Sequence, residues 1–135
     1  RAVAWLVSKQ NPDGGWGESC LSYAEDDAHG VGESTPSQTA WALLGLLCAG
    51  EVETISVVRG VNYLLRHQDP QGFWPERMHT GTGFPRVFYL RYHGYSHFFA
   101  LLAVSMYRSL KTHGRTRADE IREQNRAHGR FRLGL

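Results

Sequence analysis

The chain has 135 residues, and its 41% hydrophobic and 21% charged residues are typical of a globular protein rather than a disordered one. A formal net charge of +2 argues against a general nucleic-acid-binding protein. No apolar run reaches the roughly 20 residues of a membrane-spanning helix. The sequence therefore predicts neither a transmembrane helix nor a signal peptide, and two cysteines, Cys20 and Cys48, fit a reducing compartment without a disulfide framework or zinc motif.

An internal repeat relates residues 1–16 to residues 59–74 at an offset of 58 positions without a gap. Trp5 in the first copy corresponds to Tyr63 in the second, so this position is aromatic in both. The seven identical pairs are Arg1/Arg59, Val3/Val61, Leu6/Leu64, Gln10/Gln68, Pro12/Pro70, Gly14/Gly72 and Trp16/Trp74.

Each copy of the repeat predicts a helix that ends in a tight turn. In the first copy the helix ends near Gln10, because Pro12 disfavours helix at the residue before it. Gly14 allows the turn, Trp16 folds back over the helix end, and the glutamine amide can satisfy backbone groups of the turn. The structural residues of both turns are Gln10, Gly14, Trp16, Gln68, Gly72 and Trp74.

Four helices are predicted, and they alternate in character. The helix at 2–9 has one apolar side, formed by Val3, Leu6 and Val7. The next begins at a capping box, Thr35-Pro36-Ser37-Gln38, and runs to Gly50 with apolar residues on nearly all sides, so it should be buried and Cys48 should be a small core residue.

The third helix, at about 54–67, is amphipathic, with one stripe of Ile55, Val58, Val61 and Leu65. The fourth, from about Ser96 to Leu110, is again strongly apolar and should be buried.

This alternation predicts an all-α fold with two layers, as in an α/α barrel (toroid) with alternating inner and outer helices. Four helices cannot close such a ring, and the chain starts at Arg1 rather than Met. We therefore expect residues 1–110 to be the C-terminal part of a larger helical domain. Residues 111–135 carry seven basic and three acidic groups and are expected to form a solvated tail, partly helical or disordered, although contact with acidic lipid headgroups is an alternative.

The repeat resembles the QW motif of the triterpene cyclases, in which a glutamine at a helix end precedes Gly-x-Trp in a turn. Three further segments are similar to the bacterial squalene–hopene cyclase branch: NPDGGWGESC at 11–20, STPSQTAWALLGL at 34–46 and GTGFPRVFYLRYHGYSHFFALLA at 81–103. The resemblance covers about residues 1–110 and does not extend clearly into the tail.

The resemblance implies an enzyme that cyclises squalene to hopene or hopanol, an intramolecular transferase and lyase without a cofactor. It implies a peripheral, monotopic protein on the cytoplasmic side of the cell membrane, which takes a polyprene from the lipid. A homodimer is among its expected assemblies. In this family a buried aspartic acid protonates an alkene, and ring closure proceeds through carbocations in a cavity lined by aromatic rings.

Carbocation chemistry needs aromatic side chains, because a π-face stabilises positive charge without offering a nucleophile. The resemblance assigns Phe84 and Phe88 as cation stabilisers, and Tyr92 and Tyr95 as residues that line and brace the cavity. Leu90 would shape the cavity and bind substrate with the two phenylalanines, and Tyr89 would serve packing. Gly81, Gly83 and Pro85 should form a bend that aims Phe84 inward.

The acid of the family, an Asp-x-Asp-Asp motif, is absent from the chain. Glu25-Asp26-Asp27 is expected to be a solvated loop rather than a substitute. We therefore expect the chain to be inactive alone and to supply part of the cavity wall of a longer enzyme.

Two other functional interpretations remain open. A glycosidase of the α/α-toroid type would need two carboxylates across a cleft, for which Glu18, Glu33 and Glu76 are candidates. A non-catalytic remnant that binds apolar partners is the other. His93 and His97, four residues apart, lack a third ligand at a recognisable spacing, so no metal is expected.

Overall fold

The computed structural model describes residues 1–84, 86–114, 119 and 123. Its elements are the helices α1 (Ala2–Ser8), α2 (Pro36–Cys48), α3 (Ile55–His67) and α4 (Tyr95–His113), the strands β1 (Gly81–Phe84) and β2 (Phe88–Leu90), and the short 3₁₀ helices η1 (Cys20–Tyr23) and η2 (Asp26–Ala28). The prediction of a mainly helical chain is confirmed, with the addition of a small hairpin that the sequence analysis did not predict. The α/α barrel stays a prediction.

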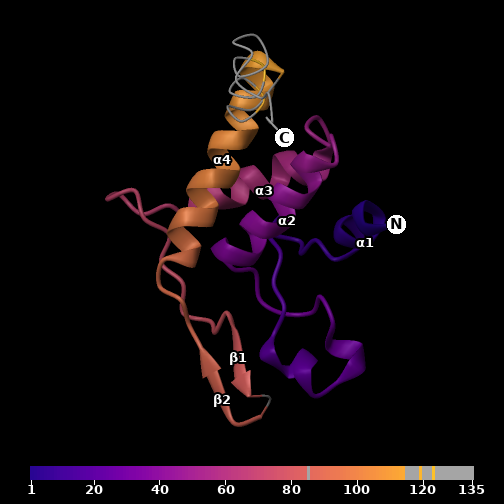
Figure 1. Ribbon diagram of the computed structural model, residues 1–135, viewed down its shortest axis with the longest axis vertical. Helices are drawn as coiled ribbons and strands as arrows, with labels where there is room; N and C mark the ends of the chain where they lie inside the picture. The colour runs from indigo at the N-terminus through magenta and orange to yellow at the C-terminus, as the bar shows by residue number, and fades with distance from the viewer. Residues whose placement is uncertain (85, 115–118, 120–122, 124–135) are drawn as a thin grey trace, which may run out of the picture.

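The helices gather around α2, as Figure 1 shows. α2 packs against α4 and α3, α3 also touches α4, and α1 lies against α2. The core therefore lies where α2 meets its neighbours, and its largest fully buried apolar side chains are Leu43, Leu46, Val57 and Leu64. The β1–β2 hairpin and the loop with η1 and η2 extend away from this core at the opposite end from the last turns of α4.

The start of α2 is fixed by side-chain caps. Thr35 Oγ1 accepts a hydrogen bond from the backbone N–H of Gln38, and Pro36 occupies the first turn, as the capping box predicts. The carboxylate of Glu76 adds a second cap, because it accepts hydrogen bonds from the backbone N–H and the hydroxyl of Ser37, both at 2.9 Å. This distant cap joins the second turn of the repeat to the beginning of α2.

The predicted stripe of α3 is correct at Val61 and wrong at its other three positions. Ile55, Val58 and Leu65 are exposed, and the buried face consists instead of Val57, Gly60, Val61, Tyr63 and Leu64. The reason lies at Gly60, where an added Cβ would come within 2.7 Å of the Trp16 ring and 2.9 Å of Leu43. Since α3 approaches the core through a residue without a side chain, its buried face is centred on Gly60 and not on the apolar stripe.

Two further expectations about apolar helices are wrong. α4 buries only Ser96, Ala100 and Ala103, whereas Phe98 is 73% exposed and its neighbours Leu101 and Leu102 are more than half exposed. The small alanines let α4 lie close to the core. Phe99, Val104, Met106, Tyr107 and Leu110 are partly buried against that core, whereas Phe98, Leu101 and Leu102 are exposed. Cys48, the last residue of α2, is exposed rather than part of the core.

The two turns of the repeat share one set of hydrogen bonds. In the first, Gln10 Nε2 donates to the Gly14 carbonyl at 2.8 Å and Trp16 Nε1 donates to the Leu6 carbonyl at 2.7 Å. In the second, the corresponding distances are 3.0 Å from Gln68 Nε2 to Gly72 and 2.8 Å from Trp74 Nε1 to Leu64. The turn glycines are left-handed, with φ of +94° and +90°, which explains why glycine occupies both positions.

The turns differ in what surrounds the glutamine. Gln10 Nε2 also donates to the carbonyl of Ser56 in the first turn of α3, at 2.8 Å, so it ties one repeat to the next. Gln68 is exposed, and its only described hydrogen bond is the one within its own turn. Both tryptophans are buried.

The backbone N–H of each turn tryptophan finds its acceptor on the following helix. That of Trp16 donates to Thr39 Oγ1 at 2.9 Å, and that of Trp74 donates to His97 Nδ1 at 3.0 Å. Thr39 and His97 are 58 positions apart, so they hold the same place in the two repeats. Residues of different chemistry thus perform one structural task.

The predicted basic tail lies largely outside the described residues. α4 ends at His113, and Gly114 follows in a left-handed conformation. Of the seven basic residues of the tail, only Lys111 is described, and it pairs with Glu53 at 2.7 Å on the surface. Among the described helices, none has the length and apolar character to cross a membrane.

Candidate functional site

The hairpin carries the two phenylalanines that the resemblance assigns to the cavity. β1 and β2 pair antiparallel, with Phe84 opposite Phe88 and an irregular register between Thr82 and Phe84. The two rings meet edge to face, with centroids 5.7 Å apart. A side chain at Gly83 would collide with the Phe88 ring, so the glycine makes room for this aromatic pair.

The bend that should aim Phe84 inward stays a prediction. Gly81 and Gly83 lie within β1, and Pro85 lies outside the described residues. Phe84 is 65% exposed and Phe88 is 44% exposed. The short strands place both rings on the hairpin, which projects from the helical core (Figure 1). The two phenylalanines are therefore brought together with each other, and their place in a closed cavity stays a prediction.

The two predicted tyrosines are brought together at the beginning of α4. The rings of Tyr92 and Tyr95 are stacked, with centroids 4.7 Å apart and planes 18° from parallel. The backbone N–H of Tyr95 donates to the Tyr92 carbonyl at 3.0 Å, which holds the segment between β2 and α4 in a tight turn. Tyr92 is about half exposed, whereas Tyr95 is partly covered.

Leu90 and Tyr89 are half-buried on β2. Leu90 pairs with Gly81 across the hairpin, and its carbonyl accepts a hydrogen bond from the Thr80 N–H at 2.8 Å. The ring of Tyr89 lies 5.9 Å from that of His79. These contacts hold the base of the hairpin against the segment of His79 and Thr80 that leads into it.

Sequence reasoning missed one member of this aromatic group, Trp41 of α2. Its ring meets Tyr95 edge to face at 5.8 Å and Phe99 at 5.5 Å. Phe99 stands 58 positions after Trp41, so the two are equivalent in the repeat. The offset relates these two aromatic positions, but their contact depends on the packing of α2 against α4.

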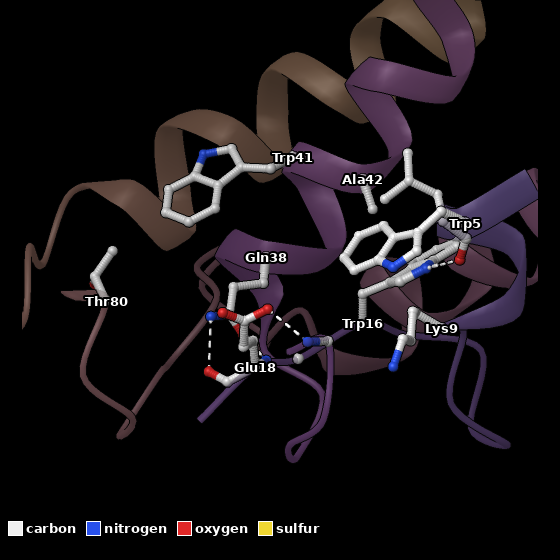
Figure 2. Close-up of a pocket in the computed structure, with 11 residues that line it drawn as sticks. Trp5, Lys9, Trp16, Glu18, Gln38, Trp41, Ala42 and Thr80 are labelled. Atoms are coloured by element: carbon white, nitrogen blue, oxygen red, sulfur yellow. Dashed lines mark hydrogen bonds between the residues drawn. The ribbon is translucent and has the colours of Figure 1, made fainter. Parts of the chain in front are cut away.

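Trp41 also lines a pocket of about 380 Å³ between α1, α2 and the loop after the first turn (Figure 2). Its wall combines the tryptophans Trp5, Trp16 and Trp41 with the polar side chains of Glu18 and Gln38. In Figure 2 the indole of Trp41 stands apart from those of Trp5 and Trp16, across the pocket from them.

Two of the three carboxylates proposed for a glycosidase accept hydrogen bonds from backbone N–H groups. Glu18 Oε2 accepts a hydrogen bond from the Gly30 N–H at 2.6 Å, and Glu76 caps α2. Glu33 is exposed. Glu25, Asp26 and Asp27 are exposed at η2, as expected for a solvated loop. The structure gives Glu18 and Glu76 structural partners and does not favour hydrolytic chemistry.

The histidines at 93 and 97 line a second pocket, of about 290 Å³, with Glu76, Arg91 and Tyr92. Nδ1 of His97 accepts the Trp74 N–H, so this nitrogen is engaged in holding the turn. Within the described residues, no three His, Cys, Asp or Glu side chains are grouped to hold a metal ion.

Burial raises the pKa of two titratable side chains, Tyr63 and Cys20. It raises the pKa of the Tyr63 hydroxyl, with smaller contributions from the carboxylates of Asp13, Glu76 and Glu33. That hydroxyl donates to the Ser34 carbonyl at 2.8 Å. Burial and the charge of Glu18 also raise the pKa of the Cys20 thiol, which disfavours a reactive thiolate there.

Comparison with known proteins covers nearly the whole described chain. Residues 1–109 match the squalene-hopene cyclase C-terminal domain. A probable squalene–hopene cyclase of Sinorhizobium fredii is 59% identical over 113 residues, which cover 83% of this chain and 18% of that protein. The squalene–hopene cyclase of Zymomonas mobilis is 56% identical over 112 residues, covering 82% of this chain and 17% of the relative.

A dammaradiene synthase of Dryopteris crassirhizoma is 47% identical over 123 residues, covering 81% of this chain and 18% of that protein. The chain thus spans less than a fifth of the length of these relatives. Because the family match extends over residues 1–109, and so over both turns, the hairpin and most of α4, the chain belongs to the squalene–hopene cyclase C-terminal domain family.

Proposed function

We propose that this chain forms part of the cavity wall of a squalene–hopene-type cyclase, in which Phe84, Phe88, Tyr92 and Tyr95 stabilise carbocations during cyclisation of squalene. The observation that supports it most is the concentration of paired rings within residues 84–95. Phe84 meets Phe88 at 5.7 Å, and Tyr92 stacks on Tyr95 at 4.7 Å.

These rings suit cation chemistry because an aromatic π-face stabilises positive charge without itself offering a nucleophilic lone pair. A desolvated cation–π contact contributes about 2 kcal/mol. Several fixed rings around developing charges lower the barrier further, because they need not reorganise during reaction. Leu90, at the base of the same hairpin, would limit the space in which the folded polyprene can lie.

The proposal includes the cellular setting that the resemblance implies. The complete enzyme would be a peripheral membrane protein on the cytoplasmic side, taking a polyprene from the lipid, with a homodimer as an expected assembly. The chain lacks the Asp-x-Asp-Asp acid, so it would contribute to cyclisation only together with a segment that supplies the proton.

A chimera tests this function. The matching C-terminal segment of the Zymomonas mobilis cyclase is replaced by this chain, and products from squalene are identified by gas chromatography with mass spectrometry. We expect pentacyclic product from the chimera and none from the chain alone. Retention of squalene without turnover would instead favour the apolar-binding remnant.

The assigned residues are tested in the same chimera. Phe88→Ala should lower the rate and increase incompletely cyclised products, because a cation loses its facing ring. Val87→Ala is the matched control, since Val87 lies on the same hairpin and is 74% exposed. Unchanged rate and product identity in Phe88→Ala would show that the assigned role is wrong.

A further inference from the structure

The rings at the start of α4 form one connected cluster, and Tyr95 is its centre. Tyr95 stacks on Tyr92 at 4.7 Å, meets Phe99 edge to face at 5.3 Å and meets Trp41 edge to face at 5.8 Å. Trp41 and Phe99 also touch each other at 5.5 Å. The stacked pair is thus supported through Tyr95 by the rings of Trp41 and Phe99.

These two supporting rings differ in origin. Phe99 lies one helical turn after Tyr95 on α4, so it moves with that helix. Trp41 lies on α2, and of the described ring contacts of Tyr95 it is the one from another helix. Trp41 therefore fixes the position of the Tyr95 ring relative to the core rather than relative to its own helix.

The packing of the two helices makes this support rigid. Ala100 and Ala103 of α4 and Leu43 of α2 are fully buried, and α2 and α4 lie side by side. A close-packed interface permits little relative motion. The indole of Trp41 therefore presents a fixed surface to Tyr95, and it also borders the 380 Å³ pocket.

We infer that Trp41 is a positioning residue for cyclisation, which sets where the stacked Tyr92–Tyr95 pair stands in the cavity wall. This inference rests on the proposed function. Trp41 acts through Tyr95 and does not itself need to touch the polyprene. Its loss should leave the chemistry possible but let the tyrosine ring move, so that a growing cation is held less well and escapes earlier.

The test compares Trp41→Leu with Trp41→Phe in the chimera described above, with the ratio of incompletely cyclised to pentacyclic products as the readout. This ratio is a property of each active molecule, so it does not depend on how much protein folds. We expect Trp41→Leu to raise the ratio about fivefold, the effect of losing one aromatic pair worth about 1 kcal/mol at 1.36 kcal/mol per tenfold. Trp41→Phe, which keeps a ring, should restore most of the wild-type ratio.

Trp5→Leu is the matched control. Trp5 lines the same pocket as Trp41, but its ring contacts, within the described residues, do not include Tyr92 or Tyr95. It should leave the product ratio unchanged. A wild-type ratio in Trp41→Leu, or an equal rise in Trp5→Leu, would overturn the inference.

Tyr95→Leu separates this inference from the proposed function. If Tyr95→Leu changes the products while Trp41→Leu does not, the cavity role stands and the positioning role of Trp41 is wrong. If Tyr95→Leu itself gives wild-type products, the cavity role assigned to Tyr95 fails, and the positioning role falls with it. When both change, Trp41→Leu should add little to Tyr95→Leu, because the two residues act together.

Discussion

The two turns of the repeat have nearly the same internal hydrogen bonds and different surroundings. The first, at 10–16, is held by a glutamine that also bonds the beginning of α3, and the second, at 68–74, by a glutamine that bonds only its own turn in the described structure. The motif therefore contains two kinds of hydrogen bond, one within the turn and one to a neighbouring helix. The turn geometry follows from local sequence, whereas the link between repeats requires that α3 lie beside the first turn.

The largest expected loss of stability comes from replacing the buried tryptophan that both turns contain. Trp16→Ala and Trp74→Ala should each lower the free energy of unfolding by about 3–5 kcal/mol, because each removes a buried indole and its hydrogen bond to a helix-end carbonyl. Urea unfolding of the chain measures both. A cost below about 1 kcal/mol for Trp74→Ala alone would show that the second turn is not anchored by its tryptophan.

Replacing the turn glycines should affect the stability of the two turns differently. Both have positive φ, so an alanine costs about 1–2 kcal/mol at either position. At Gly14 the new Cβ would also lie 2.8 Å from the Arg59 carbonyl oxygen, whereas at Gly72 the nearest atom is at 3.8 Å. We expect Gly14→Ala to cost about 1 kcal/mol more than Gly72→Ala in the same unfolding experiment. Equal costs would contradict the close approach of α3 to the first turn.

The aromatic residues that precede the two turns, Trp5 and Tyr63, predict how stability depends on pH. Tyr63 is buried and its pKa is raised, while its counterpart Trp5 cannot ionise. Because the unfolded tyrosine ionises first, the stability linked to the neutral hydroxyl is complete below about pH 10 and is lost as the pH rises further.

Tyr63→Phe should therefore flatten the alkaline fall in melting temperature and cost about 1 kcal/mol at neutral pH, through the lost bond to Ser34. Trp5→Phe serves as the comparison, since it leaves the titrating group in place. An alkaline fall that persists unchanged in Tyr63→Phe would assign it to another group.

The smallest effect distinguishes the glutamines. Gln10→Leu removes two partly buried hydrogen bonds and should cost about 1–2 kcal/mol, whereas Gln68→Leu removes one exposed bond and should cost about 0.5 kcal/mol or less. Differential scanning calorimetry of the two variants measures the difference. If the two cost the same, the bond from Gln10 to α3 adds no stability.

Features encoded by near neighbours could be predicted from the sequence. The turns follow from proline, glycine and tryptophan at fixed spacing, and the beginning of α2 follows from Thr35, Pro36 and Gln38. The helices appear close to their predicted ranges for the same reason. The wide exposure of Glu25, Asp26 and Asp27 is likewise a local property of a charged loop.

Features that depend on distant partners could not be predicted in this way. The buried face of α3 is set by the close approach at Gly60, which an apolar stripe does not reveal. The hairpin has strands of four and three residues, and its first contains two glycines, so it lacks a strand pattern. Of the site, the aromatic segment at 84–95 was evident by resemblance, whereas Trp41 is joined to it only by packing between α2 and α4.

The pairing of Thr39 with His97 bears on how duplicated units diverge. A hydroxyl oxygen and an imidazole nitrogen accept hydrogen bonds from equivalent backbone N–H groups, although the two side chains share no functional group. The distances from the backbone nitrogen to the acceptor are 2.9 and 3.0 Å. The turn therefore requires a hydrogen-bond acceptor at this position, and a hydroxyl or an imidazole can supply it. Two copies of the unit can therefore differ in sequence at this position while the tryptophan N–H of each keeps an acceptor.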